Sequence, residues 1–284
     1  MSAVPAGGGR GVEGQIQGQR EGRAERQDAA DPVTAVRMIL YRNFLSYRRA
    51  WKLFLTGFLE PVFYLLSIGI GVGALVESFD YGGREISYAT FVAPGMLAVS
   101  AFNGALLDST FNVFFKLKYG KLYDQMLATP LTTIDVARGE IIWGQLRGSI
   151  YAAGFLVVML LLGLIESWWA VLALPAVLLI GFAFSAVCMA ASTWMKTFQD
   201  FDKITLVQLP MFLFSATFFP IDTYAGPVRW IVEFTPLYRG VVLCRELTTG
   251  AVSWASVVSV VYLVAMGLLG MWLVRRRLDT LLLT

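Results

Sequence analysis

The sequence predicts an all-α integral membrane protein with six transmembrane helices. Of its 284 residues, 57% are hydrophobic and only 15% are charged, whereas ordinary soluble domains carry about 25% charged residues. Long apolar stretches recur along the chain, and each approaches the length of about 20 residues that a helix needs to cross a bilayer. Lys and Arg gather in alternate connecting segments. Composition, span length and charge order together exclude a soluble protein of this size.

The segment before the first span has two parts. Residues 1–31 are rich in Gly, Gln, Arg and Glu with little to bury, so we expect a disordered cytoplasmic tail. Residues 32–52 carry apolar side chains at helical spacing and predict an amphipathic helix in the headgroup layer. A soluble helix with a solvated charged face is the alternative. The basic residues of this predicted helix are Arg37, Arg42, Arg48 and Arg49.

Six apolar stretches follow as predicted transmembrane helices. They cover about residues 53–76, 89–115, 134–164, 168–194, 204–221 and 253–274. Most Lys and Arg outside the tail fall on the side of the N-terminus, and the other side has only Arg84, Arg229, Arg239 and Arg245. Because Lys and Arg concentrate in cytoplasmic segments, this order predicts a multi-pass protein of the plasma membrane with both termini in the cytoplasm.

The stretch 222–250 holds two short apolar runs separated by Phe234-Thr235-Pro236. Neither run is long enough to cross a bilayer. Irregular backbone at membrane depth must pack against protein or line a wet cavity, so we expect a re-entrant helical hairpin that enters from the external face. An amphipathic loop lying on the external surface is the alternative.

Residues 121–130 form a polar segment between the second and third spans and predict a short cytoplasmic helix. Its apolar stripe consists of Leu122, Tyr123, Met126 and Leu127. Thr129-Pro130 ends the helix because the residue before proline is pushed out of helical geometry, and Thr132 with Asp135 predicts a capping box for the third span. The stripe either docks into a groove on a partner or lies on lipid headgroups.

Charged and small residues inside the first two spans have open interpretations. Glu60 is either a functional carboxylate or a partner of the nearby arginines Arg48 and Arg49. Gly69 and Gly73 have GxxxG spacing, which permits close helix packing within the subunit or across a dimer. Asp108 is interpreted as a polar contact inside the bundle, with an intramembrane aspartic protease as the alternative.

Enzyme motifs are absent from the sequence. There is no histidine, no HExxH and no GxSxG, and the pair Gly120-Lys121 is followed by Leu122 rather than the Ser or Thr of a phosphate-binding loop. Cys188 and Cys244 fit no metal or redox spacing and are interpreted as small packed side chains. We therefore expect no catalytic residue, no metal site and no bound cofactor in this chain.

Four blocks of the sequence together resemble the permease subunits of ABC-2 type exporters. They are "FLEPVFYLLSIGIGVG", "FVAPGMLAVSAF", "LYDQMLATPLTTIDVARGEIIWG" and "FLFSATFFPID", and the resemblance covers roughly residues 33–284. It is greatest for the branch that includes nodulation-factor lipo-oligosaccharide exporters and drug-resistance permeases. The resemblance implies that residues 53–284 form an ABC-2 type transmembrane domain. By this resemblance, residues 121–130 contact the ATPase through Tyr123, Asp124, Met126, Leu127 and Pro130.

The same resemblance implies the partners and the cargo. Two ABC ATPase subunits would bind ATP and Mg, and a second permease, either the same chain or a sister chain, would complete the transporter. Membrane lipids would be further partners, and nucleic acid would not. The cargo would be an amphiphile, a lipid-linked saccharide or a drug moved outward. Near the outer end of the fifth span, Phe218, Phe219 and Pro220 are a candidate gate or simple aromatic anchors. An ion-gradient-driven secondary transporter is the alternative function.

Overall fold

The computed structural model describes residues 31–48, 51–76, 78–81 and 83–282, without the side chains of residues 51–58, 60–61, 70, 79–80 and 282. The predicted tail up to residue 30, Arg49 and the side chain of Glu60 therefore lie outside the described part. The α-helices are α2 (Pro32–Arg48), α3 (Trp51–Gly73), α4 (Tyr88–Leu107), α5 (Leu122–Leu127), α6 (Thr133–Leu161), α7 (Ala173–Trp194), α8 (Asp200–Leu213), α9 (Gly226–Phe234), α10 (Pro236–Thr249) and α11 (Trp254–Leu282).

Shorter elements connect these helices. Strands β1 (Phe79–Tyr81) and β2 (Arg84–Ile86) form an antiparallel hairpin. Two π-helical segments, η1 (Asp108–Asn112) and η2 (Phe115–Tyr119), extend α4. The short 3₁₀ helices are η3 (Trp168–Leu172) and η4 (Ile221–Thr223).

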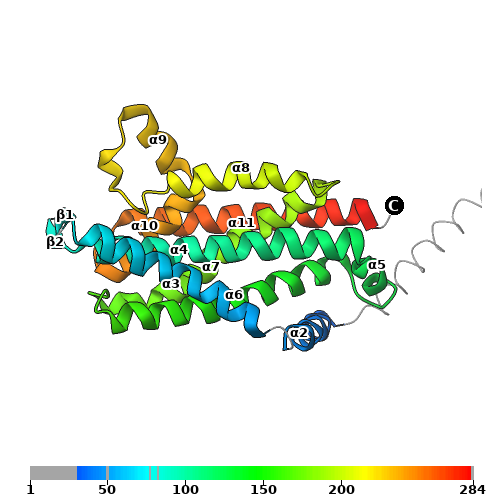
Figure 1. Cartoon of the computed structure of the whole chain (residues 1–284). Coiled ribbons are helices and arrows are strands. Elements are labelled where there is room, and N and C mark those ends of the chain that lie inside the picture. Colours follow the sequence, from blue (N-terminus) through cyan, green and yellow to red (C-terminus); the bar gives the residue numbers. More distant parts are fainter. Residues whose placement is uncertain (1–30, 49–50, 77, 82, 283–284) are drawn as a thin grey trace, which may run out of the picture.

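The long helices run side by side with α4 at the centre (Figure 1). In the described residues, four helical segments are long and apolar enough to span a membrane: Tyr88–Tyr119, Thr133–Leu161, Trp168–Trp194 and Trp254–Leu281. They coincide with the second, third, fourth and sixth predicted spans. The helices α5 and α11 end at one end of the bundle, which we call the basic end, and the β-hairpin lies at the opposite end (Figure 1).

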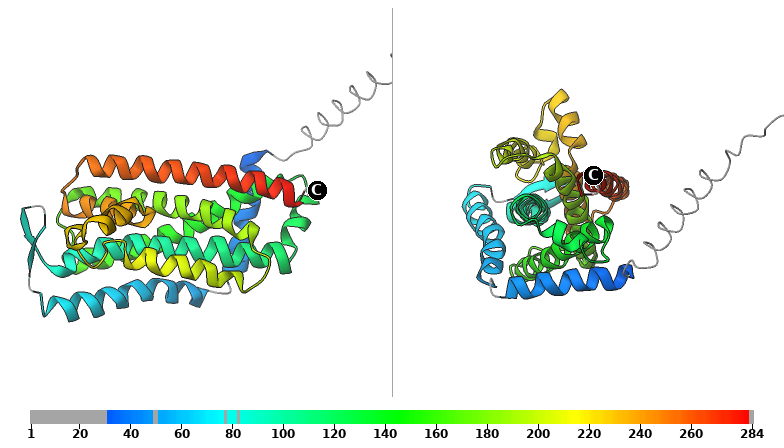
Figure 2. Two further views of the ribbon diagram at one scale, coloured as in Figure 1. Left: turned by 90° about the horizontal axis from the view of Figure 1, so that it is seen from above. Right: turned by 90° about the vertical axis from the view of Figure 1, so that its right-hand side faces the viewer.

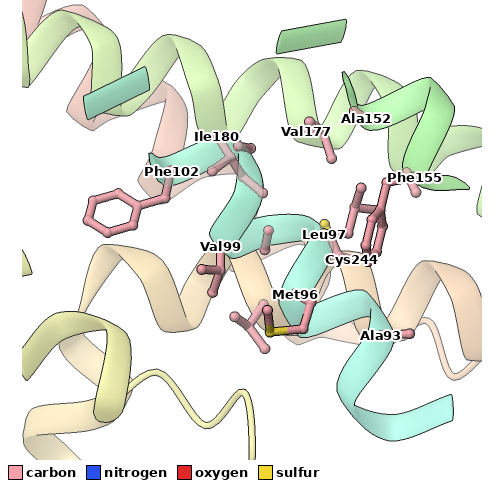
Figure 3. Close-up of a cluster of buried hydrophobic side chains, with 14 of the residues drawn as sticks. Ala93, Met96, Leu97, Val99, Phe102, Ala152, Phe155, Val177, Ile180 and Cys244 are labelled. Atoms are coloured by element: carbon pink, nitrogen blue, oxygen red, sulfur yellow. The ribbon is translucent and has the colours of Figure 1, made fainter. Parts of the chain in front are cut away.

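The core of the bundle forms where α4 packs against α7 and α10. Phe102 contacts Phe184 edge to face, with ring centroids 4.6 Å apart, and the same cluster contains Phe155, Ile180 and the free cysteine Cys244 (Figure 3). This burial agrees with the interpretation of Cys244 as a packed apolar side chain. Gly69 packs against Ala89 of α4, and a Cβ there would lie 3.5 Å from the Ala89 Cβ. Gly69 therefore serves packing within this chain.

The helix that corresponds to the fifth predicted span ends earlier than expected. We predicted a continuous helix over 204–221, but α8 ends at Leu213, and Ala216 has a left-handed φ of 53°. The buried guanidinium of Arg245 explains the break, because its Nη2 donates to the carbonyls of Ala216 and Thr217 at 2.9 and 3.3 Å.

The predicted hairpin region contains two helices, α9 and α10, which are divided at Thr235. The Thr235 hydroxyl accepts from the Tyr238 N–H at 3.4 Å and caps α10. Residues 240–249 of α10 are buried in the bundle, whereas α9 projects from it (Figure 1). The two helices are divided at Phe234-Thr235-Pro236, where the sequence separates the two apolar runs. The entry of this hairpin into the membrane from the external face stays a prediction.

Candidate functional site

The basic end is built around a close contact between α2 and α6. Helix α2 lies across the direction of the bundle (Figure 2), and Ile39 of α2 is 1% exposed. A Cβ on Gly139 of α6 would lie 2.7 Å from the Ile39 Cγ2, which is closer than real Cβ atoms approach. Glycine at 139 therefore lets the two helices meet.

The residue that follows Gly139 carries a buried carboxylate. Glu140 of α6 has a side chain that is 6% exposed, and it pairs with Arg42 at 3.0 Å and with Lys116 at 2.6 Å. The Asn43 amide donates to the same carboxylate at 3.5 Å and accepts from Arg42 at 2.6 Å. We call Arg42, Asn43, Lys116 and Glu140 the Glu140 cluster. It joins α2, the π-helical extension of α4 and α6.

Helix α5 is attached to the same cluster. Arg42 Nη1 contacts the Met126 sulfur at 3.4 Å, and Tyr123 is fully buried beside it. Burial raises the pKa of the Tyr123 hydroxyl well above its ordinary value, and the Glu140 charge adds to this rise. Among the described residues, that hydroxyl has no hydrogen-bond partner.

The predicted docking stripe of α5 needs correction. Tyr123 and Met126 do not face a partner, because they pack inside the chain in a cluster with Ile39, Val136 and Ala137. Leu127 is half-buried, and only Asp124 and Pro130 of the predicted contact set are exposed. The apolar stripe is satisfied by α2 and α6, which the sequence alone did not place next to α5.

The start of α6 forms as its sequence predicts. The Asp135 N–H donates to the Thr132 hydroxyl at 3.3 Å, and the Thr132 N–H donates to the Asp135 carboxylate at 3.1 Å. This capping box is confirmed. The Thr133 hydroxyl donates to Asp279 at 2.5 Å, which ties the end of α11 to the same region.

A second ion pair lies deeper in the bundle. Asp108 of η1 pairs with Arg147 of α6 and accepts from Asn112 at 2.9 Å. This confirms the interpretation of Asp108 as a polar contact inside the bundle. A cavity of about 10 Å³ lined by Asp108, Asn112, Lys116, Glu140 and Trp143 separates this pair from the Glu140 cluster. That volume is close to the minimum for one water molecule.

The candidate gate residues lie at the opposite end with different surroundings. The Phe218 ring packs against Phe212, with centroids 5.4 Å apart, and its carbonyl accepts from the Tyr88 hydroxyl at 3.3 Å. Phe219 is 57% exposed and Pro220 is half-buried. Of these three residues, Phe218 packs on the bundle, whereas the Phe219 side chain is mostly exposed.

The predicted interfacial arginines also differ from one another in their surroundings. Arg42 faces Glu140, whereas Arg37 and Arg48 are exposed on α2. Sequence reasoning missed Glu140, Lys116 and Asn43 as a cluster. The signal available was a charged residue directly after a glycine within the third span.

No metal centre is formed by the described residues, where no three His, Cys, Asp or Glu side chains come together as ligands. The arrangement instead holds charges that fasten three helices to one another.

A profile of the family of ABC-2 type transporters matches residues 34–248 of the chain. The chain belongs to the ABC-2 type transporter family.

Curated relatives agree with this assignment. Nodulation protein J of Rhizobium leguminosarum bv. viciae is 32% identical over 244 residues, covering 84% of this chain and 92% of the relative. Nodulation protein J of Rhizobium meliloti (strain 1021) is 28% identical over 213 residues, covering 74% and 79%. The resemblance found in the sequence is thereby confirmed. As an ABC-2 type permease, the chain is an integral membrane component of a transporter, partnered by an ABC ATPase subunit.

Proposed function

We propose that this chain is the permease subunit of an ATP-driven exporter and that the Glu140 cluster passes movement of the ATPase to the membrane helices. The observation that carries this proposal is the convergence of three elements on one buried carboxylate, with α5 attached through Arg42 and Met126. A displacement of α5 or α2 then displaces α4 and α6 together, because buried ion pairs resist separation.

The ATPase contact in this proposal is the outward face of the 121–130 segment. Asp124, Gln125, Ala128, Thr129 and Pro130 are exposed there. Two ATPase subunits bind ATP and Mg, and two permeases, identical or sister chains, form the membrane unit. Both termini face the cytoplasm, which places the basic end on the ATPase side.

The proposed cargo is an amphiphile, such as a lipid-linked saccharide, a glycolipid or a drug, moved out of the cytoplasm or the inner leaflet. Many large apolar side chains face outward along the bundle, among them Leu206, Val207 and Leu209 of α8. In a membrane this surface lies against acyl chains, the region into which an amphiphilic cargo also partitions. The names of the relatives favour cargo related to nodulation.

Co-purification tests the coupling surface. The native chain is tagged, extracted gently from its own membrane and analysed by mass spectrometry for a co-purifying ATPase with a phosphate-binding loop. Asp124→Arg is expected to weaken that association, because it reverses an exposed charge on the proposed contact. Glu85→Arg is the matched control, since it reverses an exposed charge on β2 at the opposite end.

Two results would contradict the proposal. The first is a native chain that retains no ATPase, together with transport that responds to uncouplers but not to ATP depletion. The second is equal loss of the ATPase in Asp124→Arg and Glu85→Arg, which would show that the surface of α5 has no special role.

A further inference from the structure

Two arginines at the basic end lie over tryptophan rings, away from the Glu140 cluster. The guanidinium carbon of Arg276 lies 4.4 Å from the centroid of the Trp272 ring, one turn earlier on α11. The guanidinium carbon of Arg277 lies 5.5 Å from the centroid of the Trp194 ring at the end of α7. Two consecutive guanidinium groups are thus each held by an indole.

The packing of α11 on α7 fixes this arrangement. A Cβ on Gly270 would lie 2.8 Å from the backbone of Ala186, so the two helices approach as closely as glycine allows. Val274 of the same face is fully buried. Because positions 270, 274 and 277 follow the three- and four-residue spacing of one helix face, Arg277 is directed onto α7 and meets Trp194.

The charges of this pair are not neutralised within the described part of the chain. Neither Arg276 nor Arg277 forms an ion pair with a described carboxylate. The Nε of Arg277 is buried and makes no hydrogen bond with any described residue, a situation that is rare for a buried donor. Asp279 accepts instead from Thr133. Lys196, exposed just beyond Trp194, adds a further positive charge.

The two indole rings indicate the depth of the two arginines in the bilayer. Trp194 and Trp272 are 50% and 49% exposed, and tryptophan rings gather at the boundary between headgroups and acyl chains. A guanidinium matches the geometry of a phosphate with two parallel hydrogen bonds. Because no described acid forms an ion pair with the two arginines, the site favours a ligand with net negative charge over one that also carries an ammonium group.

We propose that Trp194, Trp272, Arg276 and Arg277 form a binding site for the phosphate of an anionic phospholipid headgroup at the basic end of the bundle. Arg276 and Arg277 hold the phosphate, and the two indoles position the guanidinium groups and contact the upper acyl chains. The site does not depend on the direction of transport or on the ATPase, and the proposed orientation places it in the inner leaflet.

Lipid binding to the purified chain tests this site. The chain in neutral detergent is titrated with phosphatidylglycerol, and bound lipid is counted by native mass spectrometry. Each basic residue near a membrane surface contributes a factor of roughly five in affinity, so Arg276→Gln with Arg277→Gln is expected to lower it about 30-fold. Arg138→Gln, which removes an exposed charge at the start of α6, is expected to leave the affinity unchanged.

The control variants distinguish a specific lipid site from general electrostatic attraction and from loss of binding through misfolding. Equal affinity of the native chain and the double variant would overturn the proposal, as would an equal loss in Arg138→Gln. Displacement of the lipid by inorganic phosphate alone would also overturn it, because the indoles would then have no part. If the double variant fails to fold, Arg276→Lys with Arg277→Lys is used instead. It keeps both charges but removes the planar guanidinium groups, and weaker lipid binding is still expected.

Discussion

Glu140 is a buried carboxylate that two cations share, and its charge holds the basic end together. Removing one partner of a buried ion pair costs about 3–5 kcal/mol. Arg42 is 30% exposed and can be rehydrated, but Lys116 is only 19% exposed. We expect Glu140→Gln, which keeps the shape of the side chain, to lower the free energy of unfolding by about 2–3 kcal/mol.

Unfolding in detergent with a chemical denaturant measures this change. Asp222→Asn is the control, because its partner Arg229 is 45% exposed and an exposed pair contributes about 0–1 kcal/mol. If both variants lose the same small amount, the Glu140 cluster is not a stabilising junction.

Tyr123 allows the hydroxyl to be tested separately from the ring. The buried hydroxyl has no described hydrogen-bond partner, and an unsatisfied buried polar group costs about 1–3 kcal/mol. Tyr123→Phe should therefore leave the free energy of unfolding unchanged or raise it. Tyr123→Ala should lower it by about 3–5 kcal/mol, because it removes a large buried ring. A marked loss in Tyr123→Phe would show that the hydroxyl has a partner in the folded protein.

The same residue gives a pH dependence. Burial raises the pKa of the Tyr123 hydroxyl in the folded chain above the ordinary value of 10.0. Above pH 10 the unfolded chain therefore ionises this hydroxyl while the folded chain keeps it neutral, and the free energy of unfolding falls as the pH rises. Native protein should therefore lose stability relative to Tyr123→Phe when the pH rises above 10. Parallel denaturant titrations of both proteins from pH 8 upward measure the difference.

At the scale of the helices, the contact of α2 with α6 depends on the missing side chain of Gly139. A Cβ there would meet the Ile39 side chain at 2.7 Å, so Gly139→Val should push α2 away from α6 and weaken the Glu140 cluster. Gly148→Val is the matched control on the same helix, because a Cβ at Gly148 has no neighbour within 4 Å. Cysteine cross-linking between α2 and α6 measures the separation.

A second substitution distinguishes this steric effect from helix stiffening. Gly139→Ala places a Cβ within 2.7–2.9 Å of the Cγ2, Cβ and Cδ1 atoms of Ile39. Ile39→Gly removes all three atoms, so it should restore cross-linking when combined with Gly139→Ala. If the combination cross-links as poorly as Gly139→Ala alone, the close approach is not the cause.

The sequence predicted those elements whose formation depends on local patterns. The helix that begins at Pro32, the capping box of Thr132 and Asp135, and the break at Thr235-Pro236 all form as expected, because each depends on residues a few positions apart. The place of the first of these helices in the headgroup layer stays a prediction. The early end of α8 was missed because Arg245, remote in sequence, holds the carbonyls of Ala216 and Thr217. Tertiary contacts of this kind leave no periodic signal.

The candidate site was predicted only in part for the same reason. The position of the 121–130 helix followed from its composition and its proline. The burial of Tyr123 and Met126 could not be predicted, because it requires knowing that α2 crosses the bundle beside α5. Sequence periodicity identifies an apolar face but not the surface that covers it.

At the scale of the whole molecule, the proposed orientation gives a labelling pattern. Thr129 follows α5 at the basic end and Ala251 follows α10 at the opposite end, and both are exposed. We expect Thr129→Cys to react with a membrane-impermeant maleimide only in inside-out vesicles, and Ala251→Cys only in intact cells. Cys188 is half-buried and Cys244 is buried, so the unsubstituted chain is the background control. Labelling of both positions from one side would contradict the orientation.

The central helix has a mechanical consequence that follows from its length. The helical segment Tyr88–Tyr119 is continuous, with Lys116 bound to Glu140 near one end and Tyr88 bonded to the Phe218 carbonyl at the other. At about 1.5 Å per residue, these two side chains stand roughly 40 Å apart along the axis. A tilt of about 5° applied at Lys116 would swing Tyr88 by roughly 3–4 Å. A rigid helix of this length would carry movement at Lys116 to Tyr88, whereas bending at the wider turns of η1 and η2, near the Lys116 end, would reduce that movement.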